Sequence, residues 1–318
     1  MTTTPVILQP GGAPAAPAID FETTSEIGYY SLVWRRFRAR KVAVAGIIAL
    51  TVLALACALG PYIMSWVADL RHQPSLGGAV DPVNAQLGPF QQGHLLGTDD
   101  IGRDLLFRNL SGGRISLTVG GLAMLLTIGI ATFFGALSGF LGGIVDSATT
   151  AIINAILAIP SILLLVVFAK SFGQSIQTIV IGIGIISWPY TARIVRSVVL
   201  SAREKEFIEA ARAVGTSRAR ILTRHLIPNA LGPIVVSASL TIGQAILLES
   251  ALSFLGQGIG IPTATWGSLL HDGYQALAHP NGFFFALWPG LLILITVLSF
   301  NYIGDALRDA FDPRSLER

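Results

Sequence analysis

Long apolar runs separated by short polar segments make up most of this chain. Six of the runs reach the roughly 20 residues that a helix needs to cross a bilayer core about 30 Å thick. They cover about residues 42–64, 116–139, 148–169, 177–197, 228–252 and 284–304. Because an isolated strand cannot pair its backbone groups in lipid, the pattern predicts an all-α membrane protein with six transmembrane helices.

Two different segments precede the first run. Residues 1–28 are rich in Pro, Ala and Thr and have no basic residue ahead of an apolar core, so we expect a disordered cytoplasmic tail and no cleaved signal. In residues 29–41, Trp34 and Phe37 lie three positions apart among basic residues. This spacing predicts an N-terminal interfacial elbow helix, with a positively charged flank and an aromatic anchor as the alternative. Residues 29–318 are expected to form one transmembrane domain.

The distribution of Lys and Arg predicts the orientation in the membrane. Basic residues gather before the first run, in and around the loop 198–227, and after the last run, whereas the segment 253–283 has none. Since cytoplasmic loops carry the excess of Lys and Arg, both termini and the 198–227 loop are expected in the cytoplasm.

The overall composition excludes several classes of protein. Charged residues make up 12% of the chain and hydrophobic residues 52%, where soluble domains carry about 25% charge. The net charge of +3 gives no indication of nucleic-acid binding. No Gly-Lys pair exists, so the chain lacks a P-loop, and any ATP and Mg²⁺ would be bound by partner subunits. The dispersed histidines predict no metal site, and no directly bound cofactor is expected.

The most distinctive polar segment is Glu209–Pro228, EAARAVGTSRARILTRHLIP. Acidic residues lie at the start of a predicted short helix, where negative charge suits the helix dipole. Two small alanines leave the backbone open to a partner, and Gly215 is suited to ending the helix. The arginines that follow are available to pair with acidic groups or lipid phosphates. The candidate residues are Glu204, Glu206, Glu209, Ala210, Ala211, Gly215, Arg218 and Arg224.

This segment resembles the EAA loop of importer-type ABC permeases. The matching residues at the family spacing are Glu209, Ala210, Ala211, Gly215 and Pro228, whereas His225 and Ile227 replace the family's Ile and Leu. The resemblance implies that an external ATPase docks on this EAA-like segment. The alternative interpretation is a solvated amphipathic loop that only follows the positive-inside rule, and the five motif residues at the family spacing argue against it.

A second motif, the signature segment 94–104 (HLLGTDDIGRD), is followed by GRISL at 113–117. It resembles the signature of the dipeptide/oligopeptide/nickel permease family, in the C-type member of its permease pair, and the resemblance runs from about Trp34 to Arg314. It implies a type I ABC importer permease fold, a B-type partner permease, two cytoplasmic ATPases and an extracytoplasmic binding protein. We expect the polar signature residues to form ion pairs that fix a short outer helix, with contact to the binding protein as the alternative. The polar residues are Asp99, Asp100, Arg103 and Asp104, and Gly102 completes the candidate signature.

Glu249 is the only carboxylate well inside an apolar run. It lies 21 residues beyond Pro228, about 32 Å along a helix and hence near the outer interface. A packing hydrogen bond or a snorkelling contact is one interpretation. The other is an outer gate of the pathway, accompanied by Ser250, Ser253 and Trp266.

The function that these features favour is a permease subunit of an ATP-driven importer in the cytoplasmic (inner) membrane of a prokaryote. Peptides are the expected solute, and nickel chelates are the alternative within the same family. An ion-coupled secondary transporter that works alone and a non-transporting membrane scaffold are the rivals from other classes. Membrane lipid is an expected contact, and nucleic acid is not.

Overall fold

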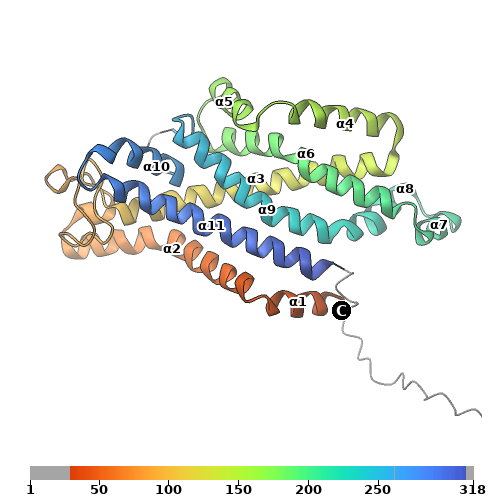
Figure 1. Ribbon diagram of the computed structural model, residues 1–318, viewed down its shortest axis with the longest axis horizontal. Helices are drawn as coiled ribbons and strands as arrows, with labels where there is room; N and C mark the ends of the chain where they lie inside the picture. The colour runs from red at the N-terminus through yellow and green to blue at the C-terminus, as the bar shows by residue number, and fades with distance from the viewer. Residues whose placement is uncertain (1–28, 261, 313–318) are drawn as a thin grey trace, which may run out of the picture.

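The computed structural model describes residues 29–260 and 262–312, and helices form the framework of this part of the chain (Figure 1). The predicted tail, residues 1–28, lies outside the described residues, as does the chain from residue 313. The helices are α1 (Tyr29–Ala39), α2 (Lys41–Arg71), α3 (Leu105–Leu141), α4 (Gly143–Leu157), α5 (Ser161–Phe172), α6 (Ile176–Ala202), α7 (Glu206–Ala213), α8 (Arg218–Ile221), α9 (Ile227–Phe254), α10 (Trp266–Gln275) and α11 (Gly282–Phe311). Short 3-10 turns cover Pro74–Gly77, Pro82–Asn84 and Ala276–Ala278, and a π-helical turn covers Leu222–Leu226.

Five helical segments in the described residues are long and apolar enough to cross a membrane: α2, α3, α6, the continuous Arg218–Phe254 segment and α11. The expected third span, 148–169, differs from the prediction because it is divided between α4 and α5, which are bent by 87°. The bend follows from Pro160, which has no N–H and disfavours a helical conformation at the residue before it. If the bent pair counts as one span, the structure has the expected six.

The centre of the bundle is formed by α3, α6 and α9, with α2 and α11 on one side and α4 and α5 on the other (Figure 1). Two glycines on α3 permit its close approach to α6. A Cβ on Gly135 would lie 2.6 Å from the carbonyl oxygen of Ala192, and one on Gly139 would lie 2.7 Å from that of Arg196. Residues with side chains cannot approach so closely, so this small-residue pair lets two spans pack backbone to backbone.

The predicted N-terminal elbow is present as the separate helix α1, and it ends where the chain turns at Arg40. Val33 and Phe37 on α1 are buried against Ala306 and Ala310 of α11. Arg40 forms an ion pair with Asp309. The first helix is therefore held against the C-terminal half of the last one, beside the end of the bundle that carries α7 (Figure 1).

Candidate functional site

The EAA-like segment begins with α7, which lies at one end of the bundle (Figure 1). Glu206 and Glu209 occupy its first turn, and Glu204 lies just before it. Gly215 has φ +76° and donates its N–H to the carbonyl of Arg212, while the N–H of Thr216 reaches the carbonyl of Ala211. This pair of bonds is the Schellman arrangement, in which glycine supplies the left-handed residue that ends a helix.

One side chain anchors α7 to the bundle. Ile208 is completely buried, and it belongs to a cluster that includes Val199 and Ala202 of α6 and Leu226. The rest of the helix is open, because Glu204, Glu206, Glu209 and Ala210 are all exposed, and Ala211 is half-buried. Two apolar residues are also uncovered, Phe207 at 41% and Val214 at 81% exposure. A helix that buries one residue and exposes apolar ones at its tip offers a surface for a partner.

The basic part of the segment differs from the expected loop. Arg218 lies in α8 and Arg224 in the π-helical turn Leu222–Leu226, so helical structure runs continuously from Arg218 into α9. Ser217 begins this stretch by accepting a hydrogen bond from the N–H of Arg220. The π-helical turn has a local cause. Pro228 has no N–H to donate, and its ring crowds the carbonyl four residues earlier. The backbone hydrogen bonds in this turn therefore join residues five apart, where an α-helix joins residues four apart.

The signature segment lies at the opposite end of the molecule, beside α10 (Figure 1). Asp99 is buried and accepts hydrogen bonds from the side chain of Arg103 at 2.7 Å and from that of Arg108 at 2.9 Å. Arg108 also donates to Asp272 of α10, at 3.1 Å. Of the expected ion pairs, Asp99–Arg103 is therefore present, whereas Asp100 forms none within the described residues. The segment forms a loop that closes on the start of α3, where we expected a short helix.

Asp104 and His94 form a buried pair within this loop. His94 Nδ1 lies 2.7 Å from Asp104 Oδ2, and the two side chains are 2% and 1% exposed. The other oxygen, Asp104 Oδ1, accepts from the N–H of Phe107 at 2.8 Å and so caps α3. Burial raises the pKa of the Asp104 carboxyl above its usual value, and the Phe107 and His94 hydrogen bonds offset only part of that rise. Gly102 has φ +81° and lies so close to Asp81 that a Cβ would overlap its carbonyl oxygen.

We expect Asp104→Ala to lower the free energy of unfolding by roughly 2–4 kcal/mol, because it removes a helix cap and leaves the buried His94 without its partner. Thermal unfolding of the purified protein in detergent measures this change. Asp100→Ala is the matched control, since Asp100 is exposed and makes no side-chain hydrogen bond within the described residues. Equal melting temperatures for the two variants would contradict a structural role for the buried pair.

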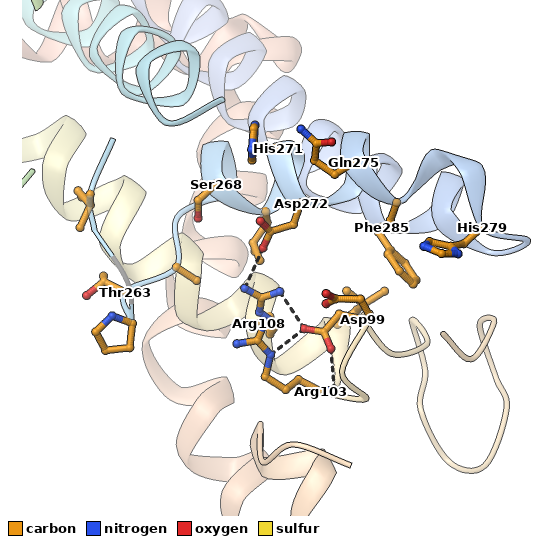
Figure 2. A pocket seen from close by; sticks show the side chains of 17 residues that line it. Asp99, Arg103, Arg108, Thr263, Ser268, His271, Asp272, Gln275, His279 and Phe285 are labelled. Carbon is orange, nitrogen blue, oxygen red and sulfur yellow. Dashed lines mark hydrogen bonds and ion pairs between the residues drawn. The ribbon is translucent and has the colours of Figure 1, made fainter. Parts of the chain in front are cut away.

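A cavity of about 460 Å³ lies between the signature segment and α10 (Figure 2). Arg108 stands in its wall between Asp99 and Asp272, and His279 and Phe285 lie on its other side. The cationic and anionic groups of the wall are largely paired with each other. Among the described residues no group of three or more His, Cys, Asp or Glu side chains is arranged to hold a metal ion.

Glu249 lies where α9, α3 and α10 meet. It is fully buried, and its carboxyl oxygens accept from Ser253 at 2.7 Å and from Ser116 at 3.2 Å. The Ser116 hydroxyl also accepts the backbone N–H of Trp266, at 3.1 Å. Complete burial contradicts the snorkelling interpretation, and these bonds favour the alternative of a packing hydrogen bond. Ser250, Ser253 and Trp266, the residues expected to accompany Glu249 at an outer gate, are buried as well.

Substituting Glu249 tests whether its role is packing or charge. We expect Glu249→Gln to retain transport, because the amide keeps an acceptor oxygen for one of the two serines. Glu249→Leu leaves both serine hydroxyls without an acceptor and is expected to cost about 1–3 kcal/mol, measured by thermal unfolding. Loss of uptake in a stably folded Glu249→Gln protein would show instead that an ionised carboxylate is required at the pathway.

Sequence reasoning missed several of the residues that build these sites. His94 was identified only as part of the signature, although it lies at one end of the motif and Asp104 at the other. The α10 helix lies in the segment 253–283, for which only the absence of Lys and Arg was noted from the sequence, although Thr265 and Ser268 form a capping box at its start. Asp146 of α4 and Arg196 of α6 form a bidentate ion pair, and no signal in the sequence links residues 50 positions apart.

Comparison with known proteins places this fold and these segments in one family. The family model "Binding-protein-dependent transport system inner membrane component" matches residues 131–317, and the model "N-terminal TM domain of oligopeptide transport permease C" matches residues 28–77. A solved structure of the MetNI methionine ABC transporter in an inward-facing conformation has a TM-score of 0.54 and 22% identity, covering 65% of this chain and 98% of its own. At that identity the likeness shows the fold alone.

Relatives with named functions resemble nearly the whole chain. The oligopeptide transport system permease protein OppC of Escherichia coli (strain K12) is 41% identical over 280 residues, which are 88% of this chain and 89% of the relative. The dipeptide transport system permease protein DppC of Alkalihalophilus pseudofirmus is 38% identical, with 88% of each chain covered. OppC of Bacillus subtilis (strain 168) is 36% identical over 94% of this chain and 95% of its own. The chain therefore belongs to the binding-protein-dependent transport system inner membrane components, and it is a multi-pass permease subunit of an ABC importer.

Proposed function

We propose that this permease carries peptides across the cytoplasmic membrane of a prokaryote, with both termini in the cytoplasm. Support for the solute comes from the relatives, of which those at 36–41% identity are named as oligopeptide or dipeptide transport permeases. Support for the orientation comes from the basic residues that gather at the end bearing α7. The pathway is shared with a second, B-type permease, and an extracytoplasmic binding protein delivers the peptide.

The observation that carries the mechanism is the exposure of α7. A short helix anchored by one buried residue, Ile208, and otherwise open to solvent is suited to dock in a groove of a separate ATPase subunit. Closure of two ATPases around ATP pushes on α7 and, through it, on the inner ends of α6 and α9, whose residues share the cluster around Ile208. The chain thus converts ATPase motion into alternating access, and ATP and Mg²⁺ bind on the partner subunits.

Purification from the native membrane in mild detergent tests this assignment. We expect two ATPase subunits and a second permease to remain bound, and we expect proteoliposomes of the complex with its binding protein to accumulate a labelled peptide when ATP is supplied. Uptake of a nickel chelate with no peptide uptake would overturn the solute and leave the importer class intact. A homo-oligomer without an ATPase would overturn the mechanism.

A further inference from the structure

Helix α4 lies on the side of the bundle and is hinged at both of its ends. At its start, Gly142 and Gly143 have φ values of +68° and +54°, a conformation that favours glycine and forms the turn from α3. At its other end, the break at Pro160 bends the chain by 87° into α5. Within α4 only Thr149 and Ile153 are buried. The apolar contact of this helix lies in its second half, where Ile153, Ile156 and Leu157 pack in a cluster with Trp188 of α6.

Polar contacts with α6 and α3 also hold α4, and they are what fixes its first half. The Arg196 guanidinium forms a bidentate pair with the Asp146 carboxylate, with Nη2 2.6 Å from Oδ2 and a second bond from Nε to Oδ1. Ser138 of α3 donates to the same carboxylate at 2.5 Å. Arg193 donates to Asn154 Oδ1 at 2.7 Å. Asp146 and Asn154 lie eight residues apart, about 12 Å along the helix, so α4 is fixed at two places along its length.

The helix that supplies these arginines is itself tied to α3 and to α7. Arg203, just after the end of α6, donates to the carbonyls of Gly139 and Phe140 at 3.0 and 3.3 Å, which satisfies acceptors at the end of α3. Only residues 203–205 separate α6 from α7, and Ile208 of α7 packs with the last turns of α6. A displacement of α7 is therefore passed directly to α6 and to the adjoining end of α3.

We propose that Asp146 and Arg196 are positioning residues that make α4 move as one body with α6 and α7 during transport. This inference rests on the proposed function, in which α7 receives the motion of the ATPase. An exposed ion pair contributes little by itself. Here the pair is bidentate, shares its carboxylate with Ser138, and lies near the glycine turn at the start of α4. The Arg196 side chain is 31% exposed and that of Asp146 is 24% exposed.

Distance measurements in the assembled transporter test this directly. Spin labels are placed at Ser147→Cys on α4 and Ser197→Cys on α6, both exposed positions, in a complex whose own Cys57 is replaced by alanine and whose partner subunits lack cysteine. With Asp146 intact, we expect the distance between the labels to be the same in the nucleotide-free and ATP-bound states. With Asp146→Asn, we expect a broader distribution that differs between the two states. A distance that changes on ATP binding with Asp146 intact would overturn the proposal.

Coupling of ATP hydrolysis to uptake is the second measurement. With Asp146→Asn, ATP hydrolysis is expected to continue, but the peptide taken up per ATP hydrolysed should fall about tenfold. A tenfold change is the scale expected for losing a hydrogen bond to a charged group. The double variant Asp146→Arg with Arg196→Asp restores the opposite charges and should recover much of the coupling. Asp309→Asn is the matched control, because it breaks a different exposed ion pair, Arg40–Asp309, and should leave coupling unchanged.

The outcomes also separate this inference from the function on which it rests. A complex that hydrolyses ATP and imports peptide equally well with Asp146→Asn refutes the positioning role and leaves the importer assignment intact. If the unaltered complex binds no ATPase, the proposed function fails first, and the effect of Asp146→Asn on the distance between α4 and α6 still reports whether the ion pair fixes α4.

Discussion

Replacing Gly215 with proline is expected to abolish peptide uptake while the protein still reaches the membrane in normal amounts. Gly215 has φ +76°, whereas the proline ring fixes φ near −65°. Proline also removes the N–H that donates to the carbonyl of Arg212. The C-terminal hydrogen bonds of α7 can then no longer form, so the helix that we propose as the docking site of the ATPase loses its shape. Uptake of a labelled peptide, set against the amount of protein in the membrane fraction, measures the effect.

Two companion variants show whether shape or charge at α7 is decisive. Gly215→Ala keeps the N–H and meets no neighbour within 4 Å, so it introduces only a left-handed alanine, a strain of about 1–2 kcal/mol, and should retain partial uptake. Glu209→Arg reverses an exposed charge in the first turn and is expected to stop uptake without affecting insertion. Normal uptake in both Gly215→Pro and Glu209→Arg would remove α7 from the mechanism.

Trp266→Ala should cause the largest loss of stability, about 3–5 kcal/mol, as for other buried tryptophans. The side chain is completely buried, and its Nε1 donates to the carbonyl of Asn109 at 3.0 Å. It fills the space above Gly113, where a Cβ would lie 2.7 Å from the indole ring. Its loss opens a cavity at the junction of α10 with α3, and the melting temperature in detergent measures the cost.

Trp66→Ala provides the control for this substitution. Trp66 lies on α2 and is 64% exposed, so its removal opens no cavity inside the bundle. We expect the melting temperature of the Trp66→Ala variant to lie close to that of the unaltered protein. Similar losses for the two tryptophans would mean that α10 is not held to the bundle by Trp266.

The helical membrane fold was predictable because its cause is local. A run of about 20 apolar residues must become a helix in lipid whatever surrounds it. The end of α7 was predictable for the same reason, since Gly215 supplies a left-handed residue that few others adopt. The third span was not predicted correctly as one straight helix, because hydropathy averages over Pro160 and does not register the bend. The extension of helical structure back to Arg218 was also missed, since Arg218, Arg220 and Arg224 were read as a loop.

The sequence by itself thus determined the apolar helices, the family resemblance and the segment that we propose as a docking site at α7, since each depends on composition or on spacing within one segment. Only the tertiary structure decided which polar groups meet. The burial of Glu249 between Ser116 and Ser253, the pairing of His94 with Asp104 inside the signature loop, and the contact of Asp146 with Arg196 all depend on how segments pack. The energy of such contacts comes from exclusion of water and from geometry between segments, and neither is encoded in the order of residues along any one of them.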